Sequence, residues 1–127
     1  MDIKLENPCN ERKNFCINCN SHFMRVRPLL KEVTISKHFK RDLKDKERIN
    51  SIIKNILDCS NLEFTELHKF EENIEGNMIF RARKENLHII YCIDKSMRII
   101  FLRAIKNFDE YRRLLESKKE LKLMIEV

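Results

Sequence analysis

The stretch from Asn77 to Asn107 constrains the fold of this chain more than any other. Its short runs of Ile, Phe and Tyr are separated by two polar clusters, Glu85-Asn86 and Asp94-Lys95-Ser96. β-Branched and aromatic residues are typical of strands, and polar clusters between such runs are typical of turns. The stretch therefore predicts three antiparallel strands joined by two tight turns.

The two turns also predict which residues face one another. A two-residue loop at Glu85-Asn86 sets the register of the first strand pair, and a turn at Lys95-Ser96 sets that of the second. The expected partners are Phe80 with Tyr91, Arg81 with Ile90, Ala82 with Ile89, Arg83 with His88, Lys84 with Leu87, Ile93 with Arg98, Tyr91 with Ile100, Ile89 with Leu102 and His88 with Arg103. Because side chains alternate between the faces of a strand, the expected core face consists of Phe80, Ala82, Ile89, Tyr91, Ile100 and Leu102.

On the opposite face, this register puts Arg83, His88 and Arg103 in one row across the three strands. Like charges directly opposite each other destabilise a sheet, so the row needs an explanation. It is either a solvated face with three unrelated charges or a site that binds an anion.

The composition is that of one globular domain. The chain has 127 residues, of which 43% are hydrophobic and 36% charged, with one Gly and two Pro. It has no apolar run near the roughly 20 residues of a membrane-spanning helix, and its first residues lack the apolar centre of a signal peptide. We therefore expect a cytoplasmic protein without a membrane partner. In that compartment the five cysteines are expected to be thiols or metal ligands rather than disulfides.

Positive charge is concentrated on the predicted meander. The whole chain carries a net charge of +6, and residues 77–113 hold nine Lys and Arg against four Asp and Glu, which is +5. Such a concentration favours a polyanionic partner, nucleic acid first, although basic surfaces also bind acidic proteins.

The first 30 residues form an extension with a cysteine pattern of its own. Cys9, Cys16, Cys19 and His22 follow a C-x6-C-x2-C-x2-H spacing. Three thiolates and an imidazole would complete a tetrahedral zinc site, which gives structural zinc as one interpretation. The simpler interpretation is a disordered extension that carries thiols, because no second ligand pair follows at the spacing of a known finger.

Residues 31–127 are predicted to form one domain. Lys31 to Ser36 reads as a strand, Ser36 as the N-cap of a helix, and an apolar stripe from Ile49 to Leu57 as a second helix that ends near Cys59. Residues 60–76 read as a connector. Asn107, with Glu110 three residues later, resembles a capping box for a last helix from Phe108. The order predicts an α+β fold: an antiparallel sheet of one N-terminal strand and the meander, with two N-terminal helices and a C-terminal helix on one face.

Three segments of this domain resemble the RelE/ParE toxin superfamily of toxin–antitoxin systems. FRARKENLHIIYCID, residues 80–94, resembles that family's strand pair, whose usual form reads Y-R-x-R-x-G-x-Y-R-x-x-Y. Arg81 and Arg83 match its two arginines, and Ile90-Tyr91 matches its closing dipeptide. ELHKF, residues 66–70, resembles the family's leucine-containing connector, and FLRAIKNFDEY, residues 101–111, resembles its last strand and polar turn. The likeness covers about 80 of the residues.

The resemblance implies a function and its partners. RelE-type members cut messenger RNA in the ribosomal A site without a metal cofactor, whereas ParE-type members inhibit DNA gyrase without catalysis. Members of both types bind a small antitoxin protein. The expected function is therefore a ribosome-dependent messenger RNA endonuclease toxin, with a gyrase inhibitor or an inactive RelE-like binding protein as alternatives.

The resemblance also implies site residues. By position, the RelE-type candidates are Arg81, Arg83, His88, Lys106, Asn107 and Tyr111. The chain departs from the usual pattern at His88, where the family has an arginine, and at Lys106-Asn107, where it often has His-Arg.

The chemistry of RNA cleavage without a metal assigns roles to these residues. The reaction needs a proton acceptor, a proton donor, and cations around the developing negative charge. Arg83 and Arg103 on either side of His88 would favour the neutral imidazole that a general base requires. Tyr111 would orient a base or donate a proton, and Phe101 would stack a nucleobase. The expected catalytic residues are Arg81, Arg83, His88 and Tyr111, and the expected RNA-binding residues are Phe101, Arg103, Lys106 and Asn107.

Overall fold

The protein is an α+β fold around one five-stranded mixed sheet. The computed structural model describes residues 29–58, 66–84 and 86–125. Its elements are β1 (Glu32–Ile35), α2 (Lys37–Asp42), α3 (Lys46–Asp58), β2 (Glu66–Ile74), β3 (Asn77–Lys84), β4 (Leu87–Ile93), β5 (Arg98–Ile105), α4 (Phe108–Glu116) and α5 (Lys118–Ile125). The sheet order is β1-β5-β4-β3-β2, in which β1 runs parallel to β5 and every other pair is antiparallel. The prediction that the N-terminal strand joins a purely antiparallel sheet is therefore wrong.

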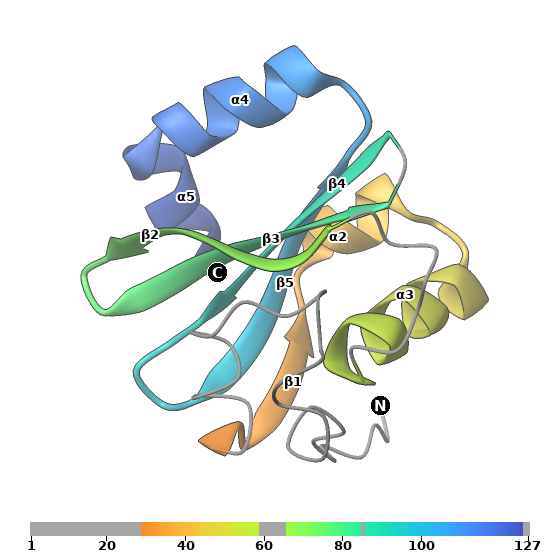
Figure 1. Cartoon of the computed structure of the whole chain (residues 1–127), viewed down its shortest axis with the longest axis horizontal. Helices are drawn as coiled ribbons and strands as arrows, with labels where there is room; N and C mark the ends of the chain where they lie inside the picture. The colour runs from red at the N-terminus through yellow and green to blue at the C-terminus, as the bar shows by residue number, and fades with distance from the viewer. Residues whose placement is uncertain (1–28, 59–65, 85, 126–127) are drawn as a thin grey trace.

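Helices cover both faces of the sheet, as Figure 1 shows, with α2 and α3 on one side and α4 and α5 on the other. The prediction that all helices pack on one face is therefore wrong. The physical reason lies in β4, whose seven residues, LHIIYCI, are all buried. A strand that is apolar on both sides must be covered on both sides. Ile89 and Tyr91 point into the core with α2 and α3, whereas Ile90 and Cys92 point into the core with α4 and α5.

The predicted helix starts are confirmed at two N-caps. The Ser36 hydroxyl accepts a hydrogen bond from the backbone N–H of Phe39 at 3.1 Å, so α2 begins where predicted. The Asn107 side-chain oxygen accepts one from the N–H of Glu110 at 2.9 Å, so α4 begins at Phe108. Each cap satisfies a helix N–H that has no partner within the helix. The chain then turns at Ser117 into a separate helix, α5, which was not predicted.

Part of the predicted connector is a strand. Residues 66–74 form β2, which pairs with β3 through a two-residue turn at Glu75-Gly76. These two residues have φ angles of 51° and 90°, as a type I′ hairpin turn requires. Gly76 is the only glycine in the sequence, and between two strand-forming runs it was the signal for this hairpin.

The first predicted register is confirmed and the second is wrong. Strands β3 and β4 pair as expected, with Arg83 opposite His88 and Phe80 opposite Tyr91. In the β4–β5 pair, Tyr91 lies opposite Phe101, and His88 lies opposite Ile105. Two features shift this pairing, a turn longer than predicted and a β-bulge at Leu102. The turn ends at Met97, whose φ is 61°, as in a three-residue loop closed by a left-handed residue.

The shift changes which residues face which core. Ile99 and Phe101 pack with α2 and α3, whereas Ile100 and Leu102 pack with α4 and α5. The prediction placed these two pairs the other way round. A one-residue slip of register exchanges the faces of a whole strand, which is the error here.

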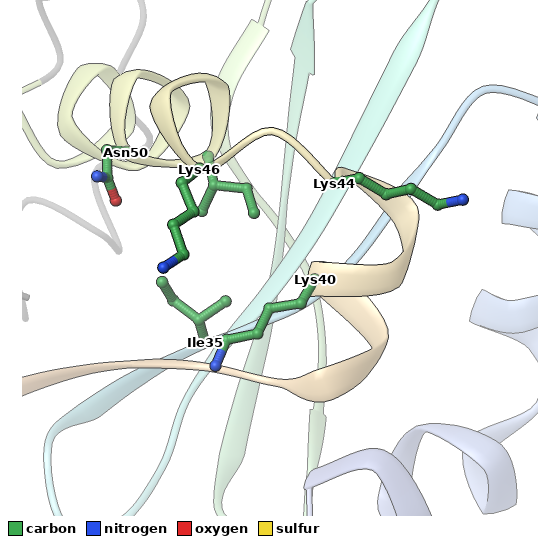
Figure 2. Close-up of a pocket in the computed structure, with 6 residues that line it drawn as sticks. Ile35, Lys40, Lys44, Lys46 and Asn50 are labelled. Carbon is green, nitrogen blue, oxygen red and sulfur yellow. The ribbon is translucent and has the colours of Figure 1, made fainter.

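The fold has a surface cavity on the side of α2 and α3. Strand β1, helix α2 and helix α3 enclose a surface cavity of about 440 Å³ (Figure 2). Among the described residues, no helix is long and apolar enough to cross a membrane.

Candidate functional site

A cluster of polar and aromatic side chains lies where α4 crosses β3 and β4. The Tyr111 hydroxyl accepts a hydrogen bond from Arg81 Nη1 at 2.8 Å. The Tyr111 ring stacks on His88, with ring centroids 4.3 Å apart and planes 12° from parallel. Phe108 lies beside both rings, at 5.8 Å from His88 and 6.0 Å from Tyr111. We call Glu71, Arg81, His88, Phe108 and Tyr111 the Tyr111 cluster.

The sequence brings this cluster together through two local rules. Arg81 and His88 lie on the same face of the sheet because the β3–β4 register places Arg83 opposite His88, and Arg81 is two residues from Arg83. Phe108 and Tyr111 are three residues apart in α4 and therefore lie on one side of the helix. The Asn107 cap sets where that helix starts, which brings both rings over His88.

Glu71 of β2 balances the charge of Arg81. Its Oε1 atom lies 3.5 Å from Arg81 Nε and 3.5 Å from the Tyr111 hydroxyl. The side chains of Arg81 and Glu71 are 12% and 22% exposed, so solvent screens this ion pair only in part. The guanidinium carbon also lies 5.5 Å from the Tyr111 ring centre, within range of a cation–π contact. Contacts with the Glu71 carboxylate, the Tyr111 hydroxyl and the Tyr111 ring thus help to hold Arg81 in place.

The cluster has a covered part and an open part. His88 is 4% exposed and Tyr111 is 3% exposed, so both lie beneath the surface. Phe108 is 54% exposed, and Arg83 and Lys106 are exposed as well. A ligand that reached this surface would therefore meet Arg83 and the Phe108 ring before His88.

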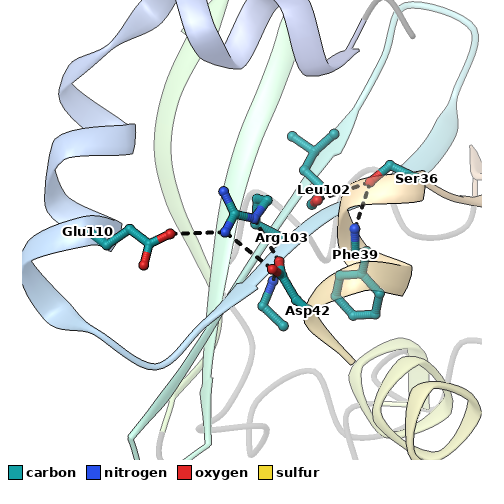
Figure 3. Close-up of polar contacts among 7 residues, drawn as sticks. Ser36, Phe39, Asp42, Leu102, Arg103 and Glu110 are labelled. Atoms are coloured by element: carbon teal, nitrogen blue, oxygen red, sulfur yellow. Dashed lines mark hydrogen bonds and ion pairs between the residues drawn. The ribbon is translucent and has the colours of Figure 1, made fainter. Parts of the chain in front are cut away.

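Arg103 does not belong to this cluster. Its Nε and Nη2 atoms bind the two carboxylate oxygens of Asp42 at 2.7 and 3.2 Å, and Nη2 also binds Glu110 at 3.0 Å. Figure 3 shows the guanidinium between Asp42 of α2 and Glu110 of α4. The prediction that Arg103 flanks His88 is wrong, because the bulge at Leu102 places Arg103 opposite Ile90.

The same region joins helix α2 to strand β5 by a second contact. Ser36 Oγ donates a hydrogen bond to the Leu102 carbonyl at 3.0 Å (Figure 3), which uses the residue at the bulge. Asp42 also accepts the N–H of Ala104 at 2.9 Å. Through its ion pairs with Asp42 of α2 and Glu110 of α4, Arg103 connects helices on the two sides of the sheet. These contacts tie α2 and α4 to β5 next to the bulge.

Phe101 does not present a ring to a ligand. It is completely buried, with its ring centre 5.6 Å from that of Phe39 and 5.5 Å from that of Tyr91. The prediction that it stacks a nucleobase is therefore wrong, and the cause is the register shift in β5. Asn107 is exposed, but its side-chain oxygen caps α4.

The predicted zinc ligands, Cys9, Cys16, Cys19 and His22, lie outside the described residues. Within the described ranges, no group of three or more His, Cys, Asp and Glu side chains could hold a metal ion. Cys92 is buried in β4, and this burial raises the pKa of its thiol to about 12. A thiol with such a pKa is not a nucleophile near neutral pH.

Sequence reasoning missed two members of the cluster. Glu71 was assigned to a connector, and the Glu75-Gly76 turn that follows could have identified its strand. Phe108 was recognised only as the start of a helix, although its spacing of three from Tyr111 could have placed it beside the predicted site.

Comparisons with protein-family models, with curated proteins and with solved structures found no match for this chain.

Proposed function

We propose that this protein has a RelE/ParE-like fold and is the toxin of a toxin–antitoxin pair, which stops translation by cutting messenger RNA on the ribosome. A small antitoxin protein would be its second partner. The proposal rests on one observation above all, the joint contact of Tyr111 with Arg81 and His88. A phenol, a guanidinium and an imidazole within one cluster are the groups that RNA cleavage by side chains alone requires.

In the proposed reaction, the 2′-oxygen of a ribose attacks the neighbouring phosphorus and the bond to the 5′-oxygen breaks. His88 would accept the proton of the 2′-hydroxyl, and Tyr111 would supply a proton to the leaving 5′-oxygen. Arg83, which is exposed beside His88, would hold the phosphate and stabilise its developing charge. Arg81 would keep the Tyr111 hydroxyl oriented, since its Nη1 donates to that oxygen.

Exposed residues around the cluster support an RNA partner. Lys106 at the end of β5 adds a second cation, and the exposed ring of Phe108 offers a face on which a base can stack. The excess of positive charge on residues 77–113 also supports an RNA partner, because it attracts a polyanion from a distance.

The test is induced expression in a bacterial host with pulse labelling of protein and DNA synthesis. Wild type should stop protein labelling first, and Arg83→Ala and Tyr111→Phe should each restore it. Arg112→Ala is the matched control, because Arg112 is exposed on α4 and its ion pair with Glu116 is exposed too. Protein labelling that stops equally in all variants would exclude catalysis by this cluster.

One observation favours a second candidate function. Because His88 is 4% exposed beneath Tyr111 and Phe108, it could act as a base only after α4 moves. A non-enzymatic inhibitor with the same fold, such as one that binds gyrase, needs no such movement. The same labelling experiment separates the two functions, because a gyrase inhibitor should stop DNA labelling before protein labelling. An inactive binding protein would stop neither.

A further inference from the structure

The cavity between β1, α2 and α3 lies away from the Tyr111 cluster. Strand β1 is an outer strand of the described sheet, and α2 and α3 pack on the face opposite α4. The cavity volume of about 440 Å³ falls within the range of about 300–1,000 Å³ that is typical of small-molecule sites. Its lining consists of Ile35, Lys40, Lys44, Lys46, Ile49 and Asn50.

No ion pair within the described residues involves the lysines that line this cavity. Among the residues that the structure describes, none of the lysines Lys40, Lys44 and Lys46 forms an ion pair, and the lining contains no carboxylate. Asp45 lies between two of them in sequence, but its carboxylate accepts the N–H of Glu47 at 2.9 Å and caps α3. Like charges that share one cavity repel each other, and a bound anion would relieve that repulsion.

The three lysine side chains do not all point in the same direction, as Figure 2 shows. The ammonium groups of Lys40 and Lys46 turn toward Ile35 and toward the same space, whereas that of Lys44 points away from them. Lys40 comes from α2 and Lys46 from the first turn of α3. Two elements that are separate in sequence therefore direct their charges to one place.

The other lining residues indicate which chemical groups the rest of the ligand contains. Ile35 and Ile49 provide an apolar surface, and the Asn50 amide can both donate and accept a hydrogen bond. Lysine is a common phosphate ligand in proteins, because its ammonium group is a point charge that can contact any of the phosphate oxygens. Two ammonium groups that converge on one space match an anion with more than one negative charge, such as a polyphosphate.

We propose that this cavity binds a small ligand with at least two phosphate charges and a flat apolar body, in the chemical class of nucleoside diphosphates and triphosphates. Lys40 and Lys46 contact the phosphates, the base lies against Ile35 and Ile49, and Asn50 hydrogen-bonds to the edge of the base. The site uses no residue of the Tyr111 cluster and does not depend on the function proposed above.

Isothermal titration calorimetry of the full chain at about 50 mM salt tests this site, since charged contacts weaken as salt rises. The probes are ATP, ADP, adenosine, tripolyphosphate and inorganic phosphate. ATP and ADP should bind more tightly than the other three. The double variant Lys40→Gln/Lys46→Gln should bind ATP about 10-fold more weakly, from two exposed charge contacts. Lys54→Gln is the control, because Lys54 is exposed on α3 outside the lining and should leave affinity unchanged.

Four outcomes would overturn the proposal. The first is no binding of ATP or ADP to wild type. The second is equal affinity of the double lysine variant and wild type. The third is a loss of affinity in Arg83→Ala, which would place the nucleotide beside the Tyr111 cluster. The fourth is tripolyphosphate binding as tightly as ATP, which would show that the apolar surface takes no part.

Discussion

Arg103 and Asp42 form a two-point ion pair that ties strand β5 to helix α2, with Nε–Oδ2 and Nη2–Oδ1 distances of 2.7 and 3.2 Å. Arg103 also binds Glu110 of α4, so one guanidinium joins helices from both faces of the sheet. Desolvation lowers the pKa of Arg103, but its hydrogen bonds and attraction to the two carboxylates outweigh this and the pKa is raised. The bulge at Leu102 is what puts Arg103 in this position.

The first prediction concerns the stability of this junction. Arg103→Met should lower the free energy of unfolding by about 1–3 kcal/mol, because it leaves two carboxylates near each other without their cation. Arg112→Met removes only an exposed pair within α4 and should change stability by less than about 0.5 kcal/mol. Urea unfolding of both variants measures the difference. Equal effects would show that the Arg103 junction does not stabilise the fold.

The second prediction separates the Tyr111 hydroxyl from its ring. Tyr111→Phe removes the acceptor of the Arg81 hydrogen bond and keeps the ring that stacks on His88. Stability should fall by only about 1 kcal/mol, while RNA cleavage, measured in an in vitro translation reaction, should fall about 100-fold or more if Tyr111 supplies a proton. Cleavage within about twofold of wild type would remove Tyr111 from the proposed mechanism.

The third prediction concerns the β2–β3 turn. Gly76→Ala should destabilise the protein by about 1–2 kcal/mol, because the φ of 90° at this position is unfavourable for a residue with a Cβ atom. Glu75→Asn is the control, since asparagine tolerates the φ of 51° found there and should not lower stability by that route. Thermal unfolding midpoints measure both effects. An unchanged midpoint for Gly76→Ala would mean that the turn relaxes at no energetic penalty.

The fourth prediction concerns pH. The pKa of His38 is lowered from its ordinary value of 6.5, by desolvation first and then by Arg41, Lys37 and Arg103, with Asp42 opposing. The unfolded chain therefore binds a proton more readily than the folded one, and protonation favours unfolding. His38→Gln should reduce the loss of stability between about pH 7 and pH 5. Urea midpoints at these two pH values test this, and an identical pH dependence in the variant would contradict it.

Much of the fold could be predicted because its signals are local. Alternation in the β3–β4 hairpin gave the correct register from Phe80 to Tyr91, and the two caps, Ser36 and Asn107, marked helix starts correctly. A turn of two residues and a capping side chain act over a few residues, so short sequence windows contain them. The positions of Arg81, Arg83 and His88 on one face followed from the same reasoning.

The wrong predictions concern features that depend on contacts between distant parts of the chain. Nothing in the sequence around Met97 indicates a left-handed residue, and the bulge at Leu102 lies where Ser36 and Asp42, which are distant in sequence, hydrogen-bond to β5. The longer turn that ends at Met97 exchanged the faces of Ile100 and Phe101, and together with the bulge it moved Arg103 away from His88.

The sequence by itself determined the strands of the meander, the first hairpin, the helix starts and the basic character of the region around His88, because these depend on neighbours in the chain. Only the tertiary structure decided that helices cover both sheet faces, that Tyr111 lies over His88, that Arg103 is a structural residue and that Lys40 and Lys46 share one cavity. Each of these depends on contacts between elements far apart in sequence, whose geometry a single bulge can change.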